Sequence, residues 1–135
     1  MKKLCQVIGV GAAILLAGCQ PTDGGASSRD VGCKLAYVFQ MKIESPGKIT
    51  DAMRSFVNSN AYEQVNDSKA RDLLKQAFQS GREALAESDP MLAGKKLSRG
   101  IGNVIAVCEG KSEIAITELF GELKNLAKEG EKQWK

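Results

Sequence analysis

The sequence predicts an all-α domain, a small bundle of four to five helices, and three observations predict it. Apolar residues recur at helical rather than strand spacing from Val31 onward. Glycine, proline and other turn formers interrupt this pattern at intervals of one helix length. The chain has 135 residues, of which 43% are apolar, as expected of one globular domain. An apolar stripe on one helix is buried only against other helices, which gives a bundle.

The first two predicted helices flank a break at Ser45-Pro46-Gly47. The first helix spans about residues 31–43, and the second follows from about residue 49 to a stop at Asn58-Ser59-Asn60. Their inward residues are predicted to be Leu35, Val38, Phe39, Met41 and Ile43 in the first helix, and Ile49, Met53, Phe56 and Val57 in the second.

The third predicted helix has the clearest pattern and begins after an N-cap at Asp67 or Ser68. Its charged residues lie opposite an apolar face made of Ala70, Leu73, Leu74, Ala77, Phe78, Ala84 and Leu85. Ser88-Asp89-Pro90 ends this helix and starts the fourth, because proline is well suited to the first turn of a helix.

The fourth predicted helix runs from Pro90 to a glycine stop at Gly110. Its apolar stripe contains Leu97, Ile101, Val104, Ile105 and Cys108. Gly94, Gly100 and Gly102 each cost about 1 kcal/mol relative to alanine in a helix interior. Close packing, a kink near residues 100–102 and a break there all remain open.

The fifth predicted helix begins after a cap at Ser112 and ends at Gly130. We expect its inward residues to be Ile116, Leu119, Phe120, Leu123, Leu126 and Ala127. Trp134 follows in a polar tail outside the pattern. The sequence leaves open whether this side chain docks on the core or contacts a partner or membrane interface.

The N-terminal segment has the layout of a secretory signal. Lys2 and Lys3 make its start positive, and residues 7–17 are almost wholly apolar. A run of about 11 residues is shorter than the roughly 20 that a membrane-spanning helix requires. We therefore expect a signal peptide rather than a permanent transmembrane helix.

The residues Leu16-Ala17-Gly18-Cys19 resemble the lipobox of bacterial lipoproteins at all four positions. In that family the cysteine thiol receives a diacylglyceryl group, the chain is cut before it, and the new amine often receives an acyl chain such as palmitate. The resemblance implies that residues 1–18 are removed and that Cys19 is the lipid attachment site. Gln20 in place of an aspartate implies sorting to the outer membrane.

This processing divides the chain into a removed signal, a lipidated tether at residues 19–30 and a helical domain at residues 31–135. Residues 20–30 have no apolar period and are rich in turn formers, which is typical of a flexible linker. About 11 such residues reach roughly 20 Å. The domain is thus expected to lie just clear of the lipid headgroups.

Cysteine use predicts one disulfide in the mature domain. Cys5 lies in the signal and Cys19 is the predicted lipid site, which leaves Cys33 and Cys108. An even pair in an exported domain is a disulfide candidate, and a loop of this length would be stabilised by roughly 4 to 5 kcal/mol on the chain-entropy model. The alternative is a pair of buried free thiols.

Charge and composition argue against several classes of function. Two of the 19 basic residues, Lys2 and Lys3, fall in the signal, which leaves 17 basic against 16 acidic side chains. That balance gives no reason to expect nucleic-acid binding. The chain has no histidine, which removes the usual general base and most catalytic zinc sites. We expect no enzyme, no catalytic or metal site, and no cofactor beyond the lipid on Cys19.

The predicted function is therefore a binding role at a membrane surface. We expect an outer-membrane lipoprotein whose helical domain faces the periplasm and contacts an envelope protein. Pilotins, immunity or exclusion lipoproteins and assembly accessories share this format, although no motif here matches any of them. The alternative is a carrier that holds a lipid or other apolar ligand in a cavity between helices.

Overall fold

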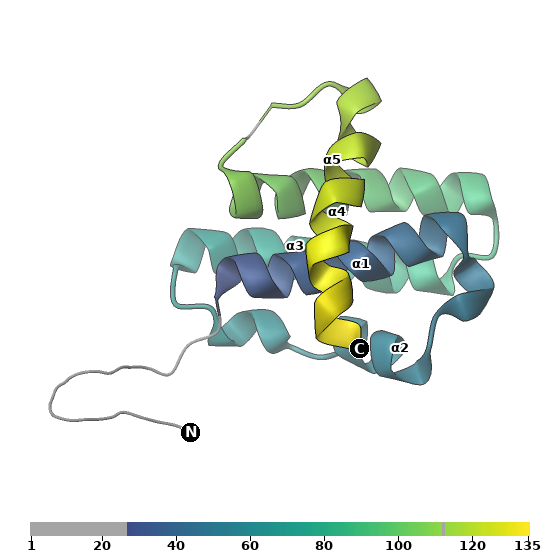
Figure 1. Cartoon of the computed structure of the whole chain (residues 1–135), viewed down its shortest axis with the longest axis horizontal. Helices are drawn as coiled ribbons and strands as arrows, with labels where there is room; N and C mark the ends of the chain where they lie inside the picture. The colour runs from purple at the N-terminus through teal and green to yellow at the C-terminus, as the bar shows by residue number, and fades with distance from the viewer. Residues whose placement is uncertain (1–26, 112) are drawn as a thin grey trace, which may run out of the picture.

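The computed structural model describes residues 27–111 and 113–135. Cys19, the signal and most of the tether lie outside these ranges. Within them the chain forms five α-helices and three 3-10 turns, so the all-α prediction is confirmed (Figure 1). In chain order the elements are α1 (Ser28–Glu44), η1 (Pro46–Lys48), α2 (Asp51–Asn58), η2 (Ala61–Gln64), α3 (Ser68–Ala86), α4 (Pro90–Glu109), α5 (Ile116–Glu131) and η3 (Lys132–Trp134).

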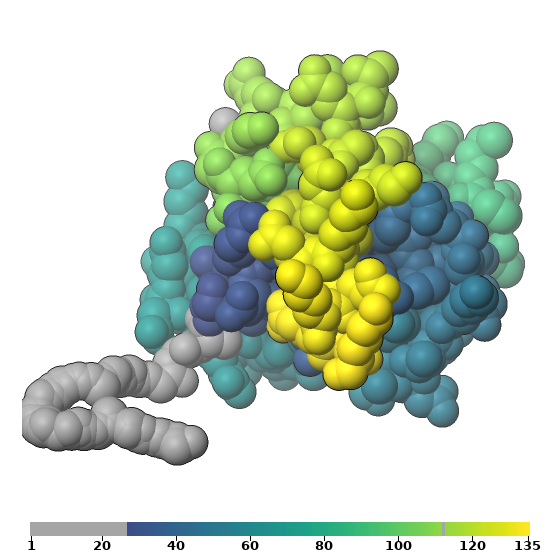
Figure 2. All heavy atoms as spheres, in the orientation of Figure 1, coloured from purple at the N-terminus to yellow at the C-terminus, as the bar shows by residue number. Residues whose placement is uncertain are grey.

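Helix α1 is the centre of the bundle and packs against α3, α4 and α5. Helices α3 and α4 lie side by side on one side of α1, and α5 crosses α1 on the other (Figure 1). Figure 2 shows α5 and η3, in yellow, lying across the middle of the molecule over α1. The largest fully buried side chains come from all five α-helices and from the residue that follows η2. They are Phe39, Phe78, Leu35, Leu74, Leu97, Ile101, Ile105, Leu123, Leu126, Val38, Val57 and Val65.

Local capping residues set several helix ends as the sequence predicts. The Asp67 carboxylate accepts hydrogen bonds from the backbone N–H groups of Lys69 and Ala70, at 2.9 and 3.3 Å, and caps α3. Asp89 caps α4 with Pro90 in its first turn. Gly110 ends α4 in the left-handed conformation, with φ of 71°.

Helix α4 is continuous through both central glycines, which settles the question that the sequence leaves open. A β-carbon on Gly100 would lie 2.9 Å from Cβ of Ser80 and 3.2 Å from the Phe39 ring, so this glycine allows close packing. A β-carbon on Gly102 would meet nothing within 4 Å. Close packing therefore explains one glycine and not the other.

Helix α1 begins earlier than predicted. The Ser27 hydroxyl accepts a hydrogen bond from the backbone N–H of Asp30, at 3.3 Å, and caps a helix that starts at Ser28. Residues 28–30 thus belong to α1, and the prediction that they are part of the tether is wrong. Residues 20–30 have the polar composition of a linker, so the sequence did not indicate that Ser27 caps a helix.

The predictions for α5 need three corrections. The helix begins after Ala115, which offers no side-chain cap, while Ser112 lies outside the described residues. Gly130 does not end the helix but lies inside it, buried against the backbone of Cys33. Ile116 and Phe120 are exposed rather than inward, because the first turns of α5 extend beyond the other helices (Figure 1).

The tail after α5 docks on the core. Trp134 donates its indole N–H to the carbonyl of Lys34 at 3.1 Å, and its ring lies 5.6 Å from that of Phe56. The Lys34 ammonium lies 4.7 Å from the centre of each of these two rings. Of the two alternatives for Trp134, the structure shows docking on the core.

Within the described ranges no helix has both the length and the apolar character that crossing a membrane requires.

Candidate binding surface

Among the described residues, five large apolar side chains are exposed, and we call the group the distal apolar surface. They come from the end of α1, the first turn of α4 and the first two turns of α5. Their exposed fractions are 39% for Ile43, 72% for Met91, 44% for Leu92, 75% for Ile116 and 41% for Phe120. The prediction that Ile43 points inward is therefore wrong, as for Ile116 and Phe120, because no helix covers this end of the bundle.

A cavity of about 190 Å³ lies within this surface. Ile43 and Phe120 form parts of its wall, and the rest is lined by Lys42, Pro46, Ser88, Pro90, Ala93, Gly94 and Leu97. A water molecule occupies about 30 Å³ in the liquid. The cavity thus has room for one large apolar side chain, and it is smaller than the roughly 300 Å³ typical of sites for drug-sized ligands.

Glu87 holds the chain that leads into α4 beside this cavity. Its carboxylate binds the Lys96 ammonium at 2.9 Å and accepts the backbone N–H of Asp89 at 3.1 Å. Its own carbonyl accepts a hydrogen bond from the Lys42 ammonium at 3.1 Å. The Lys96 hydrogen bond, helped by the Asp89 N–H, lowers the pKa of Glu87. These contacts fix the start of α4, and with it Met91, relative to α1.

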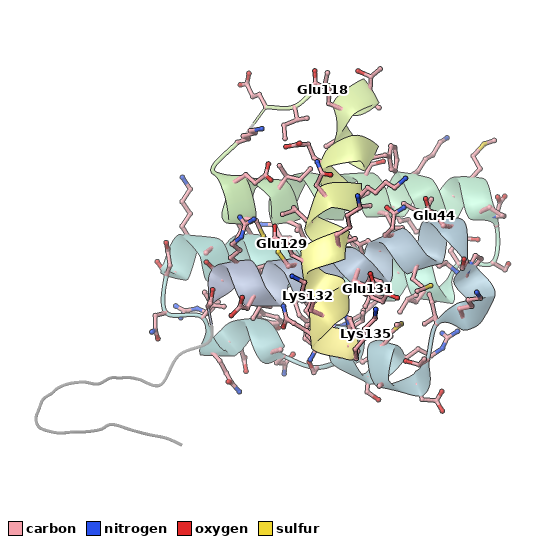
Figure 3. All side chains as sticks on the ribbon, in the orientation of Figure 1. Glu44, Glu118, Glu129, Glu131, Lys132 and Lys135 are labelled. Atoms are coloured by element: carbon pink, nitrogen blue, oxygen red, sulfur yellow. The ribbon has the colours of Figure 1, made fainter. Side chains whose placement is uncertain are left out.

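The cavity in the distal apolar surface lies at the C-terminal end of α1. Helix α1 has 17 residues, and a rise of about 1.5 Å per residue makes it roughly 25 Å long. Ile43 is near its C-terminal end, while Ser28 is at its N-terminal end (Figure 1). Figure 3 places the exposed carboxylates Glu44 and Glu118 at the end of α1 and the start of α5. An apolar centre with a charged rim is typical of protein-binding surfaces.

A second hollow, of about 570 Å³, lies between α3 and α4 near the start of α1. Ser28, Asp67, Lys69 and Asn103 contribute polar atoms to it, and its apolar lining comes from Ala70, Leu73, Ala106 and Val107, with Gly102 and Gly110. Asn103 is held by a hydrogen bond from its amide to the carbonyl of Leu73, at 3.2 Å.

The predicted disulfide is absent, although the two cysteines meet as expected. Cys33 and Cys108 are free thiols with their side chains 4.3 Å apart, whereas a sulfur–sulfur bond is about 2.05 Å long. The Cys108 sulfur lies over Gly32, where a β-carbon would clash with it, and 3.8 Å from the Arg29 carbonyl. This position against the backbone of α1 keeps the Cys108 sulfur out of bonding reach of the Cys33 sulfur.

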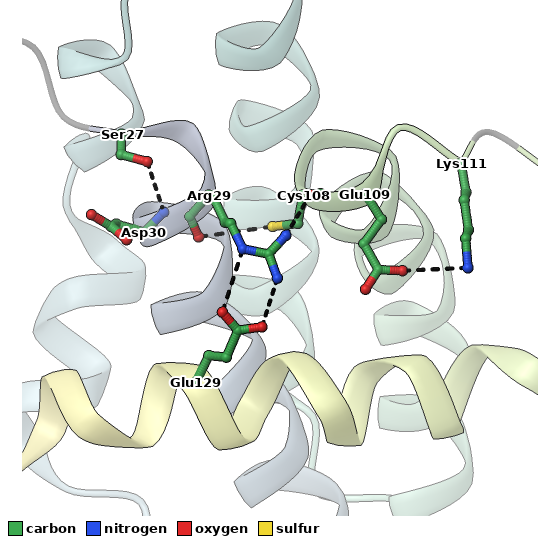
Figure 4. Close-up of polar contacts among 7 residues, drawn as sticks. All are labelled: Ser27, Arg29, Asp30, Cys108, Glu109, Lys111 and Glu129. Carbon is green, nitrogen blue, oxygen red and sulfur yellow. Dashed lines mark hydrogen bonds and ion pairs between the residues drawn. The ribbon is translucent and has the colours of Figure 1, made fainter.

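A polar network joins three helices beside the thiols (Figure 4). The Arg29 guanidinium donates to the carbonyl of Cys108 at 2.6 Å and to the Glu129 carboxylate at 2.6 and 3.4 Å. The Glu129 hydrogen bond raises the pKa of Arg29. Sequence reasoning missed this pair, because 100 residues separate its members and neither belongs to a local motif. The proximity of the two thiols lowers the pKa of Cys33 and raises that of Cys108.

The described residues contain no group of three or more histidine, cysteine, aspartate or glutamate side chains placed to hold a metal ion. The chain matches no protein-family model, no curated protein and no solved structure. The fold and the surface therefore define a small helical bundle with an uncovered apolar end.

Proposed function

We propose that this chain is an outer-membrane lipoprotein, anchored through Cys19, whose helical domain faces the periplasm and binds an amphipathic helix of a partner protein. The distal apolar surface is the observation that supports this proposal. Exposed apolar side chains grouped around a cavity are costly to leave in water and mark interaction sites on small soluble domains. The described residues offer no comparable support for catalysis.

The shape of the surface favours a helix as the partner element. The cavity between Ile43 and Phe120 has room for one apolar anchor. Met91 and Leu92 lie between the lining residues Pro90 and Ala93 in the first turn of α4, and Ile116 lies one turn before Phe120 on α5, so all three supply further exposed apolar area. A helix that presents apolar residues three and four positions apart would place one in the cavity and its neighbours on these side chains.

The position of the surface supports the same proposal. A lipid on Cys19 would hold the N-terminal end of α1 nearest the membrane. The roughly 25 Å length of α1 would then present the distal apolar surface toward the periplasm rather than toward the headgroups. This orientation is compatible with a role in assembly, pilotin-like escort or immunity and exclusion.

Site-specific photo-crosslinking in intact cells tests the proposal. A photoreactive amino acid at Phe120 should give one discrete adduct with an envelope protein, and the same probe at Asn125, exposed on the same helix, should not. Phe120→Glu should abolish the complex while circular dichroism stays unchanged. Equal adducts from both positions, or a complex that survives Phe120→Glu, would contradict a partner at this surface.

The hollow between α3 and α4 supports the carrier as a second candidate. Its volume is in the range of small-molecule sites, and Ala70, Leu73, Ala106 and Val107 offer apolar contacts to a lipid chain. Native mass spectrometry should then find a bound lipid that Gly102→Leu displaces, since a side chain at Gly102 would enter the hollow. Protein that carries no added mass would contradict the carrier.

A further inference from the structure

We propose that Cys33 and Cys108 form a two-coordinate binding site for a soft monovalent metal ion, and that this ion is Cu(I). The proposal rests on the spacing of the two thiols, on the donors around them and on the hollow that reaches them. It is independent of the function proposed above.

The spacing of the sulfurs suits an ion held between two thiolates. Metal–thiolate bonds are about 2.3 Å long for zinc, so two sulfurs lie about 4.6 Å apart on opposite sides of an ion and about 3.8 Å apart at a tetrahedral angle. Cys33 and Cys108 are 4.3 Å apart, which corresponds to a sulfur–metal–sulfur angle of about 140° at that bond length. An angle of about 140° lies between the tetrahedral and the linear value, so the spacing has room for one ion held by both sulfurs.

The donor set selects the metal. Thiolates are soft ligands and favour Cu(I), whereas structural zinc sites use four ligands in a tetrahedron. The chain has no histidine, and the described residues place no third metal ligand with the two cysteines. The Glu129 carboxylate is a hard oxygen donor and is already bound by Arg29. Two-coordinate Cu(I) is the ion that needs nothing more than this pair.

The surroundings give access to the site and hold its two halves together. Cys33 is only 2% exposed, but it lines a hollow of about 330 Å³ with Asp30, Glu129, Lys132 and Gln133. Arg29 binds the carbonyl of Cys108 at 2.6 Å, which fixes the end of α4 against α1 (Figure 4). A metal ion can therefore approach Cys33 without unfolding of the bundle.

Binding requires no redox step. Each thiol loses its proton to solvent, two sulfur–hydrogen bonds break and two metal–sulfur bonds form. The product carries one negative charge, since two thiolates surround one monovalent cation. The guanidinium of Arg29, close to both sulfurs, offsets part of that charge.

An anaerobic competition titration tests the site. The full chain, purified in detergent with reductant, is titrated with Cu(I) against a chromogenic Cu(I) chelator. We expect one tightly bound ion per chain. Cys33→Ser and Cys108→Ser should each weaken binding by more than the 10- to 100-fold that loss of an outer-shell partner typically costs. Met91→Ser, which removes an exposed sulfur-containing side chain outside this pair, is the matched control and should bind as the wild type does.

X-ray absorption of the copper-loaded wild type is a second test. It uses no variant, so its result does not depend on whether the cysteine variants fold. Two sulfur neighbours and no nitrogen or oxygen neighbour are expected. Three or more neighbours would overturn the two-coordinate site. So would equal affinity of the wild type and both cysteine variants, or wild-type protein in which Cys33 and Cys108 stay bonded to each other and take up no copper.

Discussion

The backbone carbonyl of Cys33 on α1 lies directly against Gly130 on α5, where any β-carbon would overlap it. Gly130→Ala should therefore force the two helices apart where they cross. Overpacking of this kind typically costs about 1–3 kcal/mol, and a rigid backbone carbonyl cannot turn aside as a side chain can. Urea unfolding followed by circular dichroism measures the loss.

Gly121, on the same helix, is the matched control. A β-carbon there would meet nothing within 4 Å, so Gly121→Ala should raise the free energy of unfolding by up to about 1 kcal/mol. Equal effects of the two substitutions would contradict the close crossing of α1 and α5.

The two central glycines of α4 should respond in opposite directions to alanine. Gly100→Ala places a methyl group against Ser80 and the Phe39 ring and should destabilise the fold by about 1–3 kcal/mol. Gly102→Ala adds helix propensity in open space and should stabilise it by up to about 1 kcal/mol. Thermal unfolding of both variants under one condition is the check. A stable Gly100→Ala variant would show that α4 is not packed closely on α1 and α3.

Trp134 should stabilise the bundle through its hydrogen bond to Lys34. Trp134→Phe keeps an aromatic ring but leaves the Lys34 carbonyl without its indole partner, and should cost about 1 kcal/mol. Lys135→Ala, one residue further on and exposed, should change stability by less than about 0.5 kcal/mol. Chemical denaturation measures both. If the two substitutions had the same small effect, Trp134 would not be docked.

Glu87 should make a pH-dependent contribution to stability. Lys96 lowers the pKa of this carboxyl below its ordinary 4.5 in the folded protein, so the folded state favours the charged form. Its contribution is therefore fully present above about pH 4.5 and is lost as the pH falls through the lowered folded value. Glu87→Gln should lower the melting temperature at neutral pH and have little effect in acid. Lys96→Met should reproduce this pattern, and a Glu87→Gln effect that is as large in acid would contradict it.

The sequence predicts most of the fold because the signals for helix ends are local. Asp67, Asp89 and Gly110 each act within one turn, and the structure confirms all three. The helical period of α5 correctly marks an apolar stripe. It does not say which part of the stripe finds a partner helix, so the exposure of Ile116 and Phe120 could not be read from it.

The candidate site depends on tertiary placement and is therefore harder to predict. The distal apolar surface brings together residues from α1, α4 and α5. The cysteine count predicts that Cys33 and Cys108 meet, which is correct. Counting cysteines gives no information on the direction in which their side chains point. The seat of the Cys108 sulfur over Gly32 follows only from the packing of α4 on α1.

We propose that a lipid on Cys19 anchors this bundle to the membrane. Mass spectrometry of the N-terminal peptide from membrane-extracted protein tests it most directly. We expect a chain that begins at Cys19 and carries a diacylglyceryl group, with a further acyl chain on its amine. A chain that retains residues 1–18, or that begins at an unmodified Cys19, would contradict it.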